Sequence, residues 1–299
     1  MPKLQKKPTN RLAKVRAFYQ DLKNRFHHRH LVASSWLADK GLDVETLKYA
    51  SRAAATATTL AGMIISSKPV DAQVAEQLKA LDKHKNELLE VSAEERKDIL
   101  QKMQTLLKNN VGHLPKEEEL YLEQQLTDML GFEVTAELDG HRLNHSLGIM
   151  GGEQHLKRFP SDSLAQHDAY QQAGIAPARG AFGWFTQNGE LTAEAIQREK
   201  YYFAVQTLYL PDWNQNYQQL KPWYQYRKMV AINPANGKAV VAVVGDAGPA
   251  LWVGKQFGGS PEVIKEGQVW SKEARGRVIL YFINDPENKV PLGPRDLTV

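Results

Sequence analysis

The sequence contains no cysteine. The chain therefore forms no disulfide, has no thiolate nucleophile and cannot bind zinc through sulfur. A reducing cytosol and an export route without disulfides are equally compatible with this absence. Hydrophobic residues make up 42% of the chain and charged residues 24%, which excludes a wholly disordered or multi-spanning protein.

The sequence also lacks the GxGxxG and GxxxxGKS/T motifs of nucleotide-binding proteins and the GxSxG motif of α/β-hydrolases. Its first 48 residues hold eleven Lys or Arg against four Asp or Glu, but they contain no RNA- or DNA-binding motif. We therefore expect no cofactor and no nucleic-acid partner.

Long hydrophobic runs are absent, and the segment 53–67 (AAATATTLAGMIISS) is only fifteen uncharged residues long. This is short of the ~20 residues that span a bilayer comfortably. Its length and the basic region 1–52 before it are typical of a signal peptide or signal anchor. Membrane insertion through 53–67 predicts an exported or anchored envelope protein. A buried Ala-rich helix of a small bundle is the alternative interpretation, and it predicts a cytoplasmic protein.

Residues 70–130 have the spacing of helices, and we expect a helical spacer or small bundle there. Ser92 and Glu95 form the pattern of a capping box, which predicts that a helix begins at this point. Another helix follows Pro115 and is expected to end at Gly131. The charges of these helices fit solvated faces better than a binding site.

The region 132–299 has the texture of a β-rich domain. Asp139-Gly140 is a hairpin dipeptide between two short extended runs. Four later runs, at 201–210, 227–232, 238–244 and 277–283, are rich in β-branched and aromatic residues and have no long helix between them. We therefore predict an α+β protein in which a helical N-terminal region precedes a mostly β, barrel-like domain.

The segment 227–250 carries the most informative pattern, because a strand, a tight turn and an apolar strand lead to Asp246 in a glycine-flanked turn. The apolar neighbours of Asp246 allow a partly desolvated carboxyl with a raised pKa, as a general acid requires. From the residues alone, an aspartate that caps its own turn through backbone N–H groups, with a lowered pKa, is the favoured interpretation. Glycines here allow close approach of a ligand or a neighbouring loop.

Residues 233–249 (NPANGKAVVAVVGDAGP) resemble the signature strand pair of the rare-lipoprotein-A-like double-psi β-barrels. The likeness covers about residues 180–265. The chain departs from the family pattern at two positions, because Gly258 stands where the family has a second Asp and Gln206 stands near the place of a His. Asn188-Gly189-Glu190 is similar to an upstream small-Gly-Glu segment of the family.

Members of this family bind or cleave bacterial cell-wall glycan, some of them as lytic transglycosylases. The resemblance implies that Asp246 is the general acid and base, with Glu190 as a second carboxylate and with Gln206 and Ser260 as substrate contacts. One carboxylate suffices for lytic cleavage, whereas hydrolysis normally uses two with a water between them. The departures at 206 and 258 leave a binding protein without catalysis as an alternative.

Histidines and carboxylates gather between 141 and 168, where His141, His145, Glu153, His155 and His167 occur. Imidazole and carboxylate groups suit zinc, so a zinc-dependent cell-wall peptidase is conceivable. The segment lacks HExxH or another fixed ligand spacing, and Lys157-Arg158 would oppose a cation. Surface or core histidines are therefore the favoured interpretation, and we expect no metal.

Aromatic side chains are dense in the C-terminal half, and sugar faces stack on such rings. Most aromatics in β domains serve the core, so only Trp184 and Trp252 are assigned to a glycan groove. The sequence thus predicts an envelope protein that binds, and by Asp246 cleaves, peptidoglycan or a related polysaccharide. A structural or protein-interaction module built on the same barrel is the alternative.

Overall fold

The computed structural model of the chain describes residues 91–108, 110–167, 170–269 and 275–299. The chain divides into two units, Met1–Lys79 and Ala80–Val299, and every described residue belongs to the second. The segments 1–52 and 53–67 and the first part of the helical region, 70–90, lie outside the described residues. No described helix combines the length and apolar composition needed to cross a membrane.

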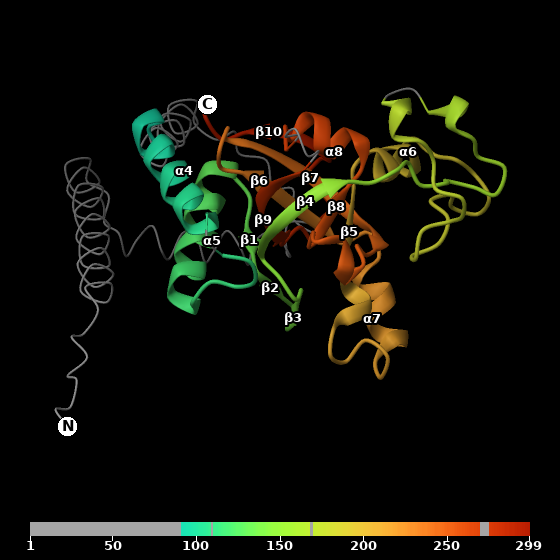
Figure 1. Cartoon of the computed structure of the whole chain (residues 1–299), viewed down its shortest axis with the longest axis horizontal. Helices are drawn as coiled ribbons and strands as arrows, with labels where there is room; N and C mark the ends of the chain where they lie inside the picture. Colours follow the sequence, from blue (N-terminus) through green and yellow to red (C-terminus); the bar gives the residue numbers. More distant parts are fainter. Residues whose placement is uncertain (1–90, 109, 168–169, 270–274) are drawn as a thin grey trace, which may run out of the picture. The chain divides into compact units, whose positions relative to one another are not determined.

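Six strands of the described region close into a β-barrel (Figure 1). They are β4 (Leu147–Gly152), β5 (Tyr202–Val205), β6 (Lys228–Asn233), β7 (Lys238–Ala247), β8 (Phe257–Gly259) and β9 (Arg275–Ile283). The ring runs β6, β9, β4, β8, β5, β7 and back to β6. Two of its pairs, β4 with β8 and β5 with β7, are parallel, and the other four are antiparallel. The α+β class and the barrel are therefore confirmed.

Short strands extend this framework. β1 (Val134–Thr135) pairs with β9, and β10 (Gly293–Asp296) pairs with β7. β2 (Glu137–Leu138) and β3 (His141–Arg142) form the predicted hairpin. Asp139 and Gly140 have φ values of 52° and 77°, the left-handed conformations that a two-residue hairpin turn requires. The predicted turn between β6 and β7 is confirmed too, since Asn233 pairs with Lys238 across it.

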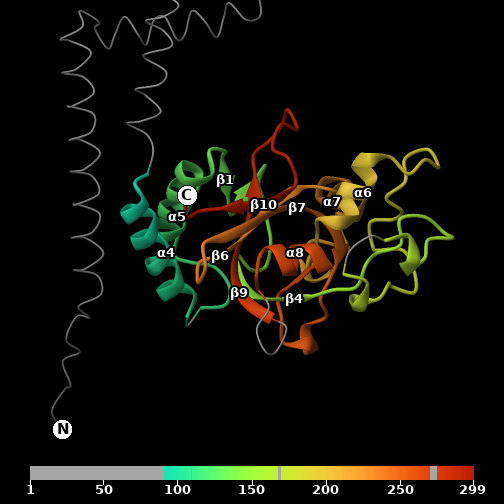
Figure 2. The ribbon, with the colours of Figure 1, turned by 90° about the horizontal axis from the view of Figure 1, so that it is seen from above.

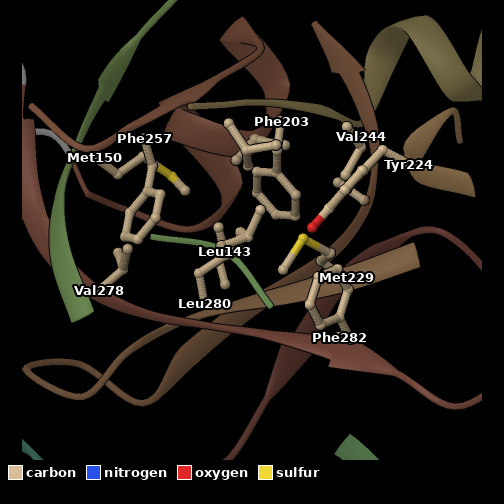
Figure 3. Packing of buried hydrophobic residues seen from close by; sticks show 14 of the residues in the cluster. Leu143, Met150, Phe203, Tyr224, Met229, Val244, Phe257, Val278, Leu280 and Phe282 are labelled. Atoms are coloured by element: carbon tan, nitrogen blue, oxygen red, sulfur yellow. The ribbon is translucent and has the colours of Figure 1, made fainter. Parts of the chain in front are cut away.

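The interior of the barrel is filled by large apolar side chains from every strand (Figure 3). Met150, Phe203, Val244, Phe257 and Leu280 belong to this cluster and are almost completely buried. Residues 239–244 of β7 are buried on both faces of the strand, because helices and loops cover the outside of the barrel. This explains why the sequence there is a continuous apolar run rather than an alternating one.

Helices α4 (Ala93–Leu107) and α5 (Lys116–Leu130) lie on one side of the barrel (Figures 1 and 2). The predicted capping box at Ser92 and Glu95 is present, and Gly131 ends α5 in the left-handed conformation. Apolar residues of both helices share one buried cluster with outward-facing residues of β6, β7 and β9. The helices and the barrel are therefore built on a common core.

The opposite side of the barrel is covered by a long connection, residues 153–192, which we call the excursion, and by α6 (Ala193–Lys200) (Figures 1 and 2). The excursion contains the short 3-10 helices η1 (Leu164–Gln166) and η2 (Gln171–Ala173). Further along, η3 (Thr207–Tyr209) and α7 (Tyr217–Tyr224) separate β5 from β6, η4 (Leu251–Val253) precedes β8, and α8 (Pro261–Glu266) follows it.

One predicted strand is shorter than its sequence indicated. The apolar run 201–210 forms a strand only over β5, and the chain then turns into η3. Val205 pairs with Ala247 at the end of β7 and with Phe257 at the beginning of β8, so the barrel wall ends there. Leu208 beyond this point is exposed. We call this end, where β5 and β7 finish and β8 begins, the Asp246 end of the barrel.

Candidate functional site

Asp246 lies near the last residue of β7, where its carboxylate holds two segments of backbone together. Its Oδ1 atom accepts the N–H of Ala181 at 2.7 Å and the N–H of Ala247 at 2.9 Å. No hydrogen bond joins Oδ2 to another residue that the structure describes. The side chain is half-buried. Burial raises the pKa of the Asp246 carboxyl above its ordinary value, and the two backbone hydrogen bonds offset this only in part.

Glycines allow the excursion to approach β7 at this point. A Cβ atom on Gly180 would lie 3.1 Å from the carbonyl oxygen of Gly245. A Cβ atom on Gly245 would lie 2.7 Å from the Cβ of Tyr202, closer than real side chains pack. The close approach predicted for the glycines of 227–250 is therefore present at Gly245, and Gly180 of the excursion, which the sequence did not single out, is its backbone neighbour.

Gln206 connects the loops at the Asp246 end. Its side chain is buried, and its Nε2 atom donates to the carbonyl oxygen of Pro249 at 3.1 Å and to that of Lys255 at 3.5 Å. Its Oε1 atom is buried and accepts no hydrogen bond from the described residues. Gln206 thus clamps the connection from β7 to β8, which begins after Ala247 and contains Trp252.

Trp252 extends from this clamped connection into solvent. It belongs to η4, and 85% of its surface is exposed. Leu251 beside it is exposed as well. An exposed indole on a rigid loop offers the flat apolar face on which a sugar ring can stack. The two predicted site residues Asp246 and Trp252, together with Gln206, therefore belong to one connected end of the barrel.

The other predicted site residues make no hydrogen bond to Asp246 within the described region. Glu190 is exposed in a tight turn of the excursion, and within the described region no hydrogen bond or ion pair joins it to Asp246. Trp184 is half-buried, and its carbonyl oxygen accepts the hydroxyl proton of Tyr226 at 3.0 Å. Ser260 is fully buried beyond the far end of β8, where its hydroxyl donates to Lys200 and accepts the N–H of Val263, capping α8.

A pocket of about 360 Å³ opens next to Gln206. Asn144, which lines it, donates from Nδ2 to the carbonyl oxygen of Gln206 at 3.3 Å. His141 lines the pocket too, and its ring lies 4.3 Å from that of Trp223. The volume is at the small end of the ~300–1,000 Å³ of ligand pockets. Its polar lining is provided by His113, His141, Arg142, Asn144 and Asp212.

The side chain of Glu153 occupies the space beside Gly258, the position at which the resembling family has an aspartate. A Cβ atom at Gly258 would overlap the Glu153 carboxyl group, with its Cδ only 2.7 Å away. Glu153 is held there by Lys255, whose Nζ lies 2.8 Å from Oε1. A carboxylate is therefore present at this part of the barrel, but it belongs to Glu153, the residue directly after β4, rather than to a residue of β8.

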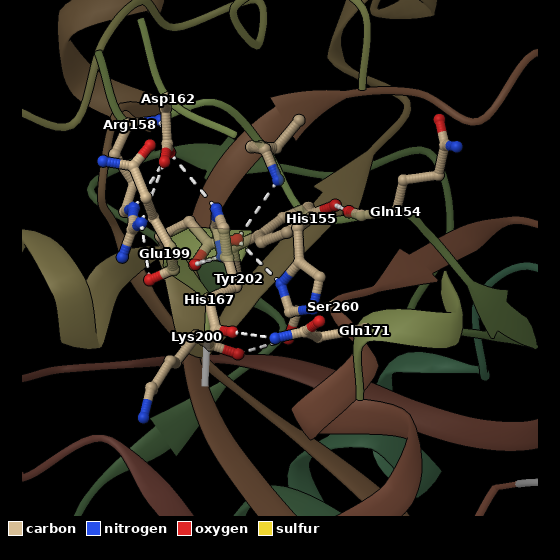
Figure 4. A network of polar contacts seen from close by, with 12 residues as sticks. Gln154, His155, Arg158, Asp162, His167, Gln171, Glu199, Lys200, Tyr202 and Ser260 are labelled. Atoms are coloured by element: carbon tan, nitrogen blue, oxygen red, sulfur yellow. Dashed lines mark hydrogen bonds and ion pairs between the residues drawn. The ribbon is translucent and has the colours of Figure 1, made fainter. Parts of the chain in front are cut away.

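A second group of titratable side chains is buried under the excursion (Figure 4). It consists of His155, Arg158, Asp162, His167 and Glu199, which we call the His155–Glu199 cluster. Glu199 accepts from both histidines, with His155 Nδ1 at 3.2 Å from Oε1 and His167 Nδ1 at 3.2 Å from Oε2. The Nε2 atom of His167 lies 3.2 Å from Asp162, which Arg158 binds through two nitrogens.

The carboxylates of the cluster are surrounded by nitrogens. Each ring nitrogen of His167 lies 3.2 Å from a carboxylate oxygen, Nε2 from Asp162 and Nδ1 from Glu199. Burial would raise the pKa of Glu199, but the two histidines hold it below its ordinary value. Burial would also raise the pKa of Asp162, but the hydrogen bonds from Arg158 hold that pKa below its ordinary value. Histidine and arginine nitrogens thus hold two carboxylates in a buried space.

Comparison with known proteins leaves the site to be interpreted from its own geometry. No family model matches this chain, and no curated protein or solved structure matches it either.

Sequence reasoning singled out His155 and His167 but not their shared partner. Glu199 lies in an eight-residue helix with no motif, 44 positions after His155, and no local pattern marks it. Within the described region, His155, His167 and Glu199 are the one group of three metal-ligating residues that converge. His141 and His145 do not join them.

Proposed function

We propose that this barrel binds a polysaccharide, peptidoglycan or a related glycan, at its Asp246 end and cleaves it by a lytic reaction through Asp246. We further propose that it is a double-psi β-barrel of the rare-lipoprotein-A-like kind. The two parallel strand pairs in an otherwise antiparallel six-stranded ring support that fold, and β6, its turn and β7 carry the resembling motif.

The observation that carries the proposal is the state of Asp246. One of its oxygens is fixed by two backbone N–H groups, the other accepts no hydrogen bond from a described residue, and its pKa is raised by burial. A carboxyl in this state holds its proton to higher pH and can protonate a glycosidic oxygen. The exposed ring of Trp252, on the clamped connection that follows β7, supplies a surface for the sugar.

The chemistry is lytic because one carboxylate acts alone. Asp246 donates its proton to the oxygen of the glycosidic bond that breaks. It then accepts the proton of a hydroxyl group on the same sugar, while the oxygen of that hydroxyl attacks the carbon released by the broken bond and closes an anhydro ring. A hydrolase would need a second carboxylate with room for a water. No hydrogen bond or ion pair joins Glu190 to Asp246 among the described residues, and the proposal assigns this step to Asp246 alone.

A second candidate function is binding without cleavage. It is favoured by the two backbone N–H groups on Asp246, which also suit a residue that fixes the excursion to β7. Trp252 and the pocket beside Gln206 would then hold the glycan alone.

The test incubates the full chain with isolated peptidoglycan and analyses both the pellet and the soluble fraction. Anhydro-muropeptides released by the parent and by Glu190→Gln, but not by Asp246→Asn, support lytic cleavage. If no protein releases muropeptides, and the parent and Leu120→Ala on α5 sediment with the wall while Trp252→Ala does not, the result supports a binding module. Neither release nor sedimentation by the parent contradicts both functions.

We propose the cellular location of the protein from its sequence. The segment 53–67 with its basic flank would export or anchor the chain, so that the barrel meets the cell wall. Fractionation of cells that express the full chain and a variant with two lysines introduced into 53–67 tests this. Parent protein in the cytosolic fraction would contradict it.

A further inference from the structure

The His155–Glu199 cluster has the composition of a metal centre, and nothing in the proposed glycan chemistry uses it. Its candidate ligands come from the excursion and from α6 (Figure 4). His155 lies near the beginning of the excursion, His167 lies further along it, and Glu199 is near the end of α6. All three side chains are almost completely buried.

The geometry points to a structural zinc site formed by His155, His167 and Glu199. Their candidate ligand atoms all lie within 4.8 Å of one another. The two His–Glu contacts measure 3.2 Å. Tetrahedral zinc with ligands at about 2.0–2.2 Å places neighbouring ligand atoms about 3.3–3.6 Å apart, so a small movement of the rings admits the ion. Two imidazoles and a carboxylate are ligands that zinc prefers.

The surroundings of His167 are those of a metal-binding histidine. Its Nε2 atom donates to Asp162, and Asp162 is fixed by Arg158 through Nε at 2.9 Å and Nη2 at 2.9 Å. A carboxylate that orients the far nitrogen of a ligating histidine is the usual outer partner of zinc. Zinc bound at Nδ1 takes the place of the proton that His167 otherwise donates to Glu199.

A second buried carboxyl supports a cation here. Glu262 on α8 is only 3% exposed, and neither of its oxygens accepts a hydrogen bond from a described residue. It interacts electrostatically with His155 and Glu199. Ser260, two residues before it, donates to the carbonyl oxygen of Lys200, directly after Glu199. A buried, unpartnered carboxyl is costly, and a nearby divalent ion reduces that cost.

Burial defines the role of the ion. A catalytic zinc keeps an open position for water and substrate, whereas a structural zinc is closed by protein. With all three protein ligands buried, the ion would join two parts of the excursion to α6, much as a disulfide does in chains that contain cysteine. Removal of zinc is therefore expected to loosen the excursion and to leave the barrel interior intact.

The experiment measures metal in the untagged full chain. We expect about one zinc per chain after dialysis, and a higher melting temperature with zinc than after treatment with a chelator. Residues 27–30 contain His27, His28 and His30, which can bind metal adventitiously, so the parent for all variants carries glutamine at these three positions.

Variants on this parent locate the ion. Glu199→Gln preserves volume and is expected to abolish stoichiometric zinc, whereas His145→Gln, outside the cluster, retains it. Asp162→Asn keeps all three ligands and is expected to weaken zinc about 10–100-fold. A parent that purifies without zinc and whose melting temperature zinc leaves unchanged would overturn the proposal. Equal zinc in the parent and in a folded Glu199→Gln would overturn it too.

Discussion

The carboxylate of Asp246 accepts the backbone N–H of Ala181 at 2.7 Å, although 65 positions of sequence separate the two residues. This contact ties the excursion to the end of β7 and uses one of the two oxygens of the carboxylate. Burial raises the pKa of Asp246, whereas the N–H of Ala181 that fixes this loop lowers it in part.

Asp246 should give the protein a defined pH dependence. Its pKa is raised in the folded state, so the folded chain binds this proton more tightly than the unfolded chain. The parent should gain stability relative to Asp246→Asn as the pH falls below the raised folded-state pKa, and the gain should be complete below the unfolded value of 3.8. Urea titrations from pH 7 to pH 4 measure the difference. Glycan release should rise over the same interval, since the acid form is the reactive one.

A parent that loses stability relative to Asp246→Asn as the solution becomes more acidic would contradict this assignment. It would mean that the two backbone hydrogen bonds outweigh burial, and that Asp246 acts only as a fixing residue.

Gln206 should stabilise the connection that bears Trp252. Gln206→Ala removes the donor to the buried carbonyl group of Pro249, and we expect a loss of about 1–3 kcal/mol in the free energy of unfolding. Amide hydrogen exchange of residues 249–255 should accelerate as well. Gln219→Ala, at an exposed position of α7, is the matched control and should change neither quantity. Unchanged exchange in Gln206→Ala would show that other contacts hold the loop.

The position of Glu153 predicts an interaction with residue 258. Gly258→Asp places a side chain and a negative charge against the Glu153 carboxylate, so we expect destabilisation of about 1–3 kcal/mol. The double variant Glu153→Ala/Gly258→Asp should recover much of this loss, and Lys255 would then pair with the new carboxylate. A double-mutant cycle measured by urea unfolding determines the coupling. Additive losses would mean that the two positions do not interact.

Helix α4 should be essential to the stability of the barrel. Met103 is fully buried in the cluster that α4 and α5 share with β6, β7 and β9. We expect Met103→Ala to cost about 2–5 kcal/mol, because it leaves a cavity in a shared core. Leu120→Ala on α5, where the side chain is 51% exposed, is the control and should cost much less. If Met103→Ala unfolds α4 alone and the barrel still unfolds at the same urea concentration as in the parent, the result contradicts a common core.

Local features of the fold could be predicted from the sequence because they depend on residues close to one another in the chain. The hairpin at Asp139-Gly140 follows from two residues that tolerate positive φ, and the capping box at Ser92 from a partner three positions away. The β6–β7 turn is equally local. The β-branched and aromatic runs likewise identified strands and, without long helices between them, a barrel.

What only the tertiary structure decided was which distant residues meet. Closure of the ring and the return of the excursion bring Glu199 to His155 and His167, and bring Glu153 beside Gly258. The same packing buries Ser260 as a helix cap and leaves Glu190 without a contact to Asp246 among the described residues. Side-chain identity gives the chemistry of each group, but its neighbours, its burial and therefore its pKa depend on the path of the whole chain.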